Sequence, residues 1–318
     1  MNDWYVDDRC TNCDVARQFA PELFGEEEGR SKVLRQPNGA AENRRLHAAA
    51  FACHTRSIRP GAGKLDPSLD PFPMALEDGL EDGSEDGANG DANGNANGDV
   101  NGGAKGDVLL CGHNSTHTAG ANSYLLRRPS GTAMMIDTPR WSPGLAERYT
   151  ATTGPVTDVL LTHRDHVAHG RRYADHFGAR MWIHEGDLDA APDADQVIRG
   201  LDPVEIGEGV TAHPLPGHTK GSVLYLADDR YCFSGDSFYW SRTTRDLEVV
   251  ESVTWYSIEV LAASLARTAG KLRFEWVLPG HGDRHRLDAD EMSRRLHALA
   301  ERAALLQPQE VDLTAIRW

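Results

Sequence analysis

The stretch that decides the fold runs from residue 159 to residue 169 and reads VLLTHRDHVAH. Its first four residues are apolar or β-branched and predict a short strand, which three histidines and an aspartate follow. Polar side chains directly after a strand lie at a sheet edge, where a rigid scaffold can aim them at one point. A single histidine in such a place is more often a capping or surface residue, so the assignment of a site depends on the rest of the chain.

Three later stretches repeat this arrangement of a metal-capable side chain beside a predicted strand. They are PGHTKGS at residues 216–222, FSGD at 233–236 and LPGHG at 278–282. Imidazole and carboxylate groups suit zinc, iron or manganese and do not form a thiolate-type site. One such loop is weak evidence, but four in one chain predict a shared metal site built from His163, His218, Asp236 and His281.

The residues around these loops alternate between short strands and helices. Strands are predicted at 108–111, 123–127, 133–137, 158–161, 180–184, 210–213, 222–227, 230–234 and 276–278, and helices at 143–150, 166–177, 257–269 and 288–306. Such interleaving predicts an α/β domain in which helices cover sheets.

Composition divides the chain into three parts. Residues 77–107 hold nine acidic residues and one lysine, about half of the net charge of −15, in Glu-Asp-Gly and Ala-Asn-Gly-Asp repeats that offer little to a packed core. We therefore predict a flexible acidic linker over 61–107, between a small domain at 1–60 and a larger one at 108–318. The rest of the chain is mildly acidic without a basic stripe, which argues against a nucleic-acid partner.

The cysteines and the N-terminus bear on the compartment. There are five cysteines, an odd number that argues against a disulfide framework. The acidic start, Met1 to Trp4, lacks the basic and apolar regions of a signal peptide, and no apolar run approaches the roughly 18 residues that a membrane span needs. We expect a cytoplasmic protein that does not bind a membrane; its oligomeric state is left open.

Together, the four loops resemble the metallo-β-lactamase superfamily, which includes glyoxalase II, lactonases, arylsulfatases, RNase Z and flavodiiron proteins. In that family a strand ends in Thr-His-x-His-x-Asp-His, and later loops carry Gly-His-Thr-x-Gly-Ser, Gly-Asp and Pro-Gly-His. Over residues 108–300 the matching positions are Thr162-His163, His218, Asp236 and His281, and Asp137 matches an early structural aspartate. The resemblance implies a four-layer αββα sandwich and a metal-dependent hydrolase.

The first motif departs from the family pattern. Asp165 stands where the second histidine is expected, and Val167-Ala168 replaces the Asp-His pair that usually holds a second metal. His166 and His169 lie three apart on a predicted helix start, so they would share a face and either could substitute; His166 could equally cap the helix or face solvent.

These departures leave the number and kind of metal ions open. One site would use His163, Asp165, His218 and Asp236, and a second would keep Asp236 and His281 with His166 as a candidate. One or two ions of zinc or iron are therefore expected, and the added carboxylate moves the preference toward iron or manganese. Asp236 would bridge or orient, while Asp165 would ligate or act as a base; both are candidate catalytic residues.

The N-terminal part also resembles a less-studied branch of this superfamily, in which a ferredoxin-like segment precedes the hydrolase domain. Cys10, Cys13 and Cys53 match a single-cluster ferredoxin, but Ala16 stands at the third cysteine position and His54 where a proline usually follows. Three thiolates could hold a [3Fe–4S] cluster, or a [4Fe–4S] cluster with an outside ligand. Alternatively the thiolates and His54 form a structural zinc site, or the segment binds nothing.

Three functions follow from these features. The first is hydrolysis of an ester, thioester or lactone, with a small-molecule substrate and a metal-activated water. The second is a non-haem iron oxidoreductase or oxygenase that receives electrons from the N-terminal iron–sulfur segment or a redox partner. The third is a catalytically degenerate module that only binds.

Overall fold

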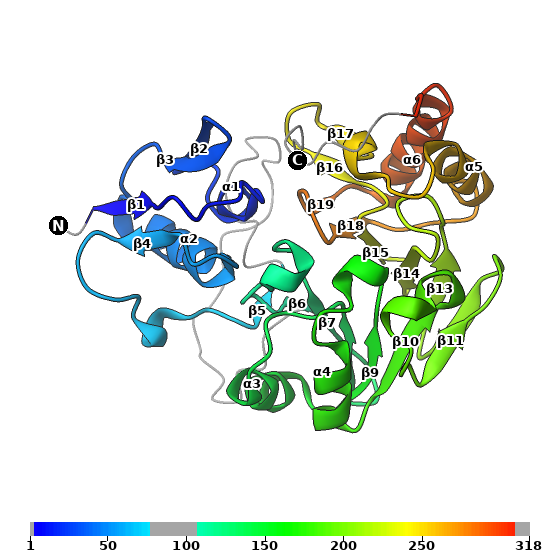
Figure 1. The fold of residues 1–318 in the computed structure, drawn as a ribbon, viewed down its shortest axis with the longest axis horizontal. Coiled ribbons are helices and arrows are strands. Elements are labelled where there is room, and N and C mark those ends of the chain that lie inside the picture. The colour runs from blue at the N-terminus through cyan, green and yellow to red at the C-terminus, as the bar shows by residue number, and fades with distance from the viewer. Residues whose placement is uncertain (1–2, 77–106, 309–318) are drawn as a thin grey trace, which may run out of the picture.

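The computed structural model describes residues 3–76 and 107–308. It shows an N-terminal segment, residues 3–60, packed beside a larger C-terminal sandwich, which consists of residues 107–308 together with one short strand at residues 74–75 (Figure 1). Residues 77–106, which make up most of the predicted linker, and residues 309–318 lie outside the described part of the chain. Among the described residues, no helix is long and apolar enough to cross a membrane.

The N-terminal segment contains two small antiparallel sheets and two helices. Strand β1 (Trp4–Val6) pairs with β4 (Ile58–Pro60), so that the two ends of the segment are joined, and β2 (Phe24–Glu27) forms a hairpin with β3 (Arg30–Val33). Helix α2 (Gly39–Ala52) buries mostly alanines against α1 (Val15–Phe19), because small side chains let two helices approach closely.

The C-terminal sandwich is built on two sheets. The first sheet has seven strands in the order β11-β10-β9-β8-β7-β6-β5, with bounds β5 Met74–Ala75, β6 Val108–Leu110, β7 Tyr124–Arg127, β8 Ala133–Ile136, β9 Val156–Leu160, β10 Arg180–His184 and β11 Gln196–Ile198. The second has six strands in the order β12-β13-β14-β15-β18-β19, with bounds β12 Val204–Gly207, β13 Val210–Pro214, β14 Val223–Ala227, β15 Tyr231–Gly235, β18 Trp276–Pro279 and β19 His285–Arg286. A separate hairpin joins β16 (Tyr239–Ser241) to β17 (Asp246–Glu248).

The alternation of side chains along each strand explains why the sheets stack. On β7, Tyr124 and Leu126 point into the core between the sheets, whereas Leu125 points outward to the helices. On β15, Tyr231 and Phe233 point inward and Cys232 outward. Strands that are apolar on both faces must be covered twice, which produces four layers.

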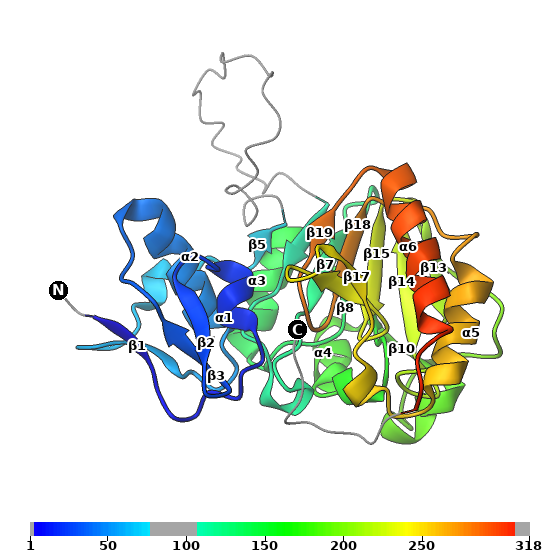
Figure 2. The same cartoon turned by 90° about the horizontal axis from the view of Figure 1, so that it is seen from above.

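Helices cover both outer faces. Helices α3 (Pro143–Thr153) and α4 (Gly170–Phe177) pack on the seven-stranded sheet, and α5 (Ile258–Thr268) and α6 (Ala289–Ala303) on the six-stranded sheet. Figure 2 shows α5 and α6 side by side along the outer face of their sheet. This arrangement confirms the αββα class predicted from the sequence.

The structure corrects the predicted linker boundary. The sequence predicts a linker over 61–107, but Met74–Ala75 forms β5, which pairs with β6 as the edge strand of the seven-stranded sheet. Phe72 and Leu76 are buried in the same core. The prediction failed here because the strand is only two residues long and directly precedes the low-complexity repeats, so no periodicity marks it.

The N-terminal segment is tied to the C-terminal sandwich by polar contacts. The Asp14 carboxylate, which is buried, pairs with Arg242 at 2.6 Å, and Arg242 also pairs with Asp283. Gln18 accepts a hydrogen bond from Asn122 at 3.0 Å. Breaking a buried ion pair costs several kcal/mol, so these contacts hold the segment in a defined position.

Candidate metal centre

The predicted metal-binding loops meet at one place, although more than a hundred residues separate the first from the last. His163 and the turn Arg164–His166 follow β9 of the first sheet, and His218 lies on the loop between β13 and β14. Asp236 follows β15, and His281 follows β18, both in the second sheet. A hydrogen bond from the Val223 amide to the Thr162 carbonyl, at 2.8 Å, joins the two sheets beside the site.

One carboxylate oxygen lies at the centre of the group. Oδ2 of Asp236 is 3.0 Å from Nδ1 of His281 and 3.4 Å from Nε2 of His166. The same oxygen is 3.6 Å from Nε2 of His163 and 3.8 Å from Nε2 of His218. Four imidazoles therefore surround a single carboxylate.

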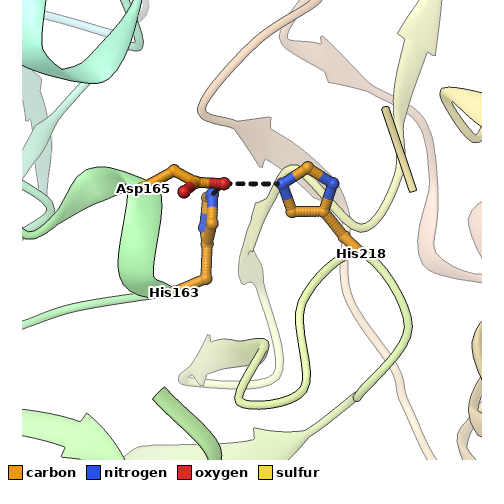
Figure 3. Close-up of side chains that lie close together, drawn as sticks. All are labelled: His163, Asp165 and His218. Carbon is orange, nitrogen blue, oxygen red and sulfur yellow. Dashed lines mark ion pairs between the residues drawn. The ribbon is translucent and has the colours of Figure 1, made fainter. Parts of the chain in front are cut away.

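Asp165 completes a second, more open arrangement. Its Oδ2 is 3.8 Å from Nε2 of His163 and 3.6 Å from Nε2 of His218, and the three side chains point toward one another in Figure 3. The potential ligand atoms of His163, Asp165 and His218 all lie within 4.8 Å of one another, as do those of His163, His166 and Asp236. The Asp165 side chain is 47% exposed, in contrast to the buried histidines.

The hydrogen-bonding state of the histidines fits a cation. The Nε2 atoms of His163, His166 and His218 are buried without a hydrogen-bond partner. Buried polar atoms are nearly always satisfied, and several unsatisfied nitrogens directed at two carboxylates need a common explanation. Imidazole nitrogens and carboxylate oxygens are the donors that zinc and iron accept, so the residues present fit one or two such ions.

Burial and neighbouring charges shift the pKa values of Asp236 and His166 in opposite directions, and the neighbouring charges prevail. Burial would raise the pKa of Asp236, but the imidazoles of His281 and His166 hold it well below its usual value. Burial likewise opposes the charged form of His166, yet the carboxylates of Asp236 and Asp137 raise its pKa to about 10. Asp236 is thus an anion in a pocket of imidazoles, which favours a positive charge at the centre.

Residues beside the site hold the ligands in place. Asp137, at the end of β8, has a φ of +54°, and its carboxylate accepts hydrogen bonds from the Thr162 amide at 2.9 Å and Nδ1 of His166 at 2.8 Å. A carboxylate on the far nitrogen of a histidine orients the ring and fixes its tautomer. Gly280 is required because a Cβ there would lie 2.3 Å from the His166 ring and 2.7 Å from Asp236.

A further positioning residue, Asp187, was missed in the sequence. Its buried carboxylate accepts hydrogen bonds from the Arg164 amide at 3.0 Å, the Thr219 hydroxyl at 2.5 Å and the Gly221 amide at 3.1 Å. It thereby connects the loop of His163 to the loop of His218. The only sequence signal was an aspartate three residues after a predicted strand, which is too common to single out.

The structure separates His166 from His169, contrary to the expectation that they share a helix face. Helix α4 begins only at Gly170, and Arg164–His166 forms a 3₁₀ turn followed by Ala168 with a φ of +32°. This turn directs His166 into the site. The His169 ring instead packs edge-on against His117, with ring centroids 5.2 Å apart, and belongs to neither ligand group.

The ligands line a cavity of about 660 Å³. One side of it is formed by Asp165, His166, His218, Asp236 and His281, and Trp255 lies at another. The N-terminal segment closes a third side with Thr11, Asn12, Cys13, Gly29 and His54. Five of the candidate metal ligands and the ferredoxin-like segment therefore share one cavity, which the sequence did not predict.

The three N-terminal cysteines lie around a separate small cavity, which we call the thiol site. Cys10, Cys13 and Cys53 line it together with Ala16 and Ser31. The Cys10 sulfur accepts hydrogen bonds from the Asn12 and Ser31 amides, both at 3.4 Å, and the Cys53 sulfur from the Ser57 amide at 3.4 Å. Burial raises the pKa of the Cys13 thiol to about 12.

The thiol site does not have the spacing of a single-ion site. Among the described residues, three or more potential ligand atoms come within 4.8 Å of one another only in the C-terminal sandwich. Sulfurs bound to one zinc ion at about 2.3 Å would lie about 3.8 Å apart. The three cysteines therefore do not form a set as compact as the metal centre, and the amides of Asn12, Ser31 and Ser57 are directed at their sulfurs.

Comparisons with known proteins agree with this division of the chain. A family model described as the metallo-beta-lactamase superfamily matches residues 118–301, more than half of the chain. A second model, the 4Fe-4S single cluster domain of ferredoxin I, matches residues 6–59.

Individual relatives cover the C-terminal part. A hydroxyacylglutathione hydrolase of Methylobacterium sp. (strain 4-46) is 33% identical over 185 residues, 56% of this chain and 71% of that protein. A second one, of Methylobacterium nodulans, is 33% identical over 152 residues, 46% of this chain and 59% of that protein. The crystal structure of ETHE1 from Myxococcus xanthus is similar with 22% identity and a TM-score of 0.44, covering 59% of this chain and 83% of that one.

Proposed function

The chain belongs to the metallo-beta-lactamase superfamily, and on that premise we propose that its metal centre hydrolyses a thioester of a small organic acid. The observation that carries the proposal is the set of buried imidazole nitrogens of His163, His166 and His218, which have no hydrogen-bond partner and surround Asp236. The thioester class is the bond that the named relatives, hydroxyacylglutathione hydrolases, act on.

The proposed roles follow from position and exposure. His163, His218 and Asp165 would hold one ion, and Asp236 with His166 and His281 would hold a second or enlarge the first site. When bound, a divalent cation lowers the pKa of a coordinated water and polarises the scissile carbonyl. Iron, manganese or zinc all suit this mixed set of donors.

Asp165 and Asp236 would have different roles, one as a proton acceptor and the other as an orienting residue. Asp165 is 47% exposed and lines the cavity, so its carboxylate can accept the proton of the attacking water and release it to solvent. Asp236 is buried and bonded to His281, both through its Oδ2 and through the His281 amide, which donates to Oδ1 at 3.1 Å. It would therefore orient the other ligands.

The thiol site supports a second component of the proposal. We propose that Cys10, Cys13 and Cys53 hold an iron–sulfur cluster, on the evidence of the ferredoxin match and the amide–sulfur hydrogen bonds. Cys13 lines both the thiol site and the main cavity, so a cluster there would lie beside the metal centre. This position is the one observation that favours the alternative function, a non-haem iron oxidoreductase. The degenerate binding module likewise remains a prediction.

The test is metal-dependent thiol release. Protein purified without oxygen is freed of metal with a chelator and reloaded with zinc, iron or manganese. Each form is then given 2-hydroxyacyl thioesters, and the released thiol is measured with a colorimetric thiol reagent. We expect the chelated protein to lose about 10³-fold in rate and one of the metals to restore it. His218→Ala should abolish the restored activity, whereas His297→Ala, an exposed histidine on α6, should leave it unchanged. Thiol release that persists without metal, or no release with any metal, contradicts the proposal.

A further inference from the structure

Among the described residues, the cavity lining lacks the cationic side chains that would bind the carboxylates of a glutathione thioester. Sixteen described residues line the cavity, and none of them is lysine or arginine. Apart from the histidines, the only charged side chains among these lining residues are the carboxylates of Asp165 and Asp236, which face the metal centre. A glutathione leaving group carries two carboxylates, and buried or half-buried carboxylates need cationic or amide partners.

Three arginines that neighbour lining residues, namely Arg242, Arg164 and Arg17, are already paired with carboxylates. Arg242 pairs with Asp14 and Asp283, and Arg164 lies 2.9 Å from Asp189. Arg17 pairs with Asp14 as well. Each of these guanidiniums would have to leave a carboxylate partner in order to reach an anionic substrate.

The N-terminal rim adds no surplus of positive charge. Gly29, which lines the cavity, follows directly after Glu26, Glu27 and Glu28 in the β2–β3 hairpin, while Arg30 and Lys32 follow it. Lys32 is held by Glu27 at 2.7 Å. Arg17 lies 4.0 Å from Glu26, so this rim has three carboxylates and three basic side chains and offers an anion no surplus of positive charge.

The rest of the lining suits an uncharged, partly apolar group. Trp255 is 45% exposed at the cavity and Val253 lies beside it, which offers an aromatic surface for a carbon chain. From the N-terminal segment, Thr11 and Asn12 offer neutral hydrogen-bonding groups. Polar but uncharged donors next to an aromatic surface are typical of sites for neutral ligands.

We propose that the cavity binds a thioester whose leaving group is uncharged, and that the N-terminal segment forms the wall that contacts this group. The inference rests on the proposed thioester chemistry for its substrate class, and it separates this chain from its hydroxyacylglutathione hydrolase relatives. The segment is held firmly enough to act as a wall, because Asp14, Gln18 and the Ala52 carbonyl all bond to the C-terminal sandwich.

Binding of two thioethers that cannot be hydrolysed tests the inference without relying on turnover. S-hexylglutathione and S-hexyl-N-acetylcysteamine share the alkyl chain and the sulfur but differ in charge. Calorimetry on the full metal-loaded chain should give the neutral thioether a Kd at least about tenfold lower. Equal or tighter binding of S-hexylglutathione overturns the inference. If the neutral thioether binds but no thioester is hydrolysed, the inference stands and the proposed function fails.

A charge placed on the N-terminal wall tests its contact with the ligand. Thr11 is exposed and lines the cavity, so Thr11→Arg should tighten S-hexylglutathione at least about fivefold and leave the neutral thioether within twofold. Leu34→Arg adds the same charge to the same segment at a side chain that is 62% exposed and does not line the cavity, and it should change neither Kd. Equal responses of the two variants would show that the segment does not face the ligand. If Thr11→Arg fails to fold, the wild-type comparison of the two thioethers still decides the charge preference.

Discussion

The metal centre and the thiol site are both ligand sets, but the chain prepares them in different ways. In the metal centre, imidazole nitrogens of His163, His166 and His218 are buried without hydrogen bonds and converge around Asp236. In the thiol site, the sulfurs of Cys10 and Cys53 already accept amide hydrogen bonds and surround a cavity. The first arrangement leaves buried nitrogens that one or two cations would satisfy, whereas the sulfurs of the second already have hydrogen-bond partners.

The difference also lies in what supports each set. The metal ligands stand on loops of two stacked sheets, and Asp137 and Asp187 fix those loops through buried hydrogen bonds. The cysteines stand in a segment of short strands and two helices. A rigid scaffold can hold unsatisfied donors in place without collapse, whereas a small segment needs its polar groups paired.

The largest expected effect is that one substitution empties one site and leaves the other site occupied. Asp236→Ala removes the carboxylate that four imidazoles surround, so we expect loss of the metal of the C-terminal sandwich and a fall in thioesterase rate of about 10³-fold, equivalent to about 4 kcal/mol of barrier. The iron and acid-labile sulfide content of the thiol site should be unchanged in the Asp236→Ala variant. Metal analysis and the visible spectrum of anaerobic protein measure both.

The reciprocal variant completes that test. Cys53→Ala should remove the sulfide and the brown colour and leave the metal of the sandwich bound. Cys232→Ala serves as the matched control, because that thiol is buried outside both sites. If either Asp236→Ala or Cys53→Ala empties both sites, the two sets are not independent and the comparison fails.

A smaller effect distinguishes the two histidines that follow the first motif. His166→Ala removes a nitrogen 3.4 Å from Asp236 and should weaken metal binding about 10- to 100-fold. His169→Ala removes a ring that packs on His117 and should leave metal affinity within about twofold. Competition with a chromogenic chelator measures both; equal losses would mean that the 3₁₀ turn does not separate the two residues.

The sequence predicted the metal loops because each candidate ligand lies on a loop at the edge of a predicted strand, and such strands are recognised as short runs rich in Val, Ile, Leu and Tyr between Gly, Pro or Asp. The alternation of strands and helices predicted only an α/β domain, and the αββα class followed from the resemblance to the metallo-β-lactamase superfamily. In the structure, Leu125, Met135 and Cys232 make the outward faces apolar, which is why helices cover both sheets. The sequence could not predict the direction of His166, because a 3₁₀ turn and a helix start have similar residue patterns.

The shared cavity was beyond reach for a different reason. It depends on how the N-terminal segment packs on the C-terminal sandwich, which is decided by contacts such as Asp14 with Arg242, 228 residues apart. Nothing local in either stretch marks the partner. The same holds for β5, whose two residues are recognisable only by the strand with which they pair.

The smallest expected effect concerns the seam where the connection from the N-terminal segment meets the sandwich. Asp70 pairs with His113 at 2.9 Å and with Arg148, and its side chain is only 5% exposed. Burial would raise the pKa of Asp70, but His113 and Arg148 hold it below its usual value. Its carboxylate therefore stabilises the folded state above the unfolded pKa of about 4, and this contribution is lost as the pH falls through the lower folded value.

Asp70→Asn should accordingly cost about 1.5 kcal/mol of the free energy of unfolding at pH 7, the scale of hydrogen bonds to a charged group. The difference from the wild type should shrink as the pH is lowered below about 4, because the wild-type carboxyl then becomes neutral too. Urea unfolding at several pH values measures it, with the exposed Asp193→Asn as the matched control. A difference that stays constant down to pH 3 would mean that Asp70 acts through shape and not through charge. In that case the stability of the seam would come from satisfied hydrogen bonds, as in the thiol site. Of the three places compared, only the metal centre would then be governed by the interaction of opposite charges.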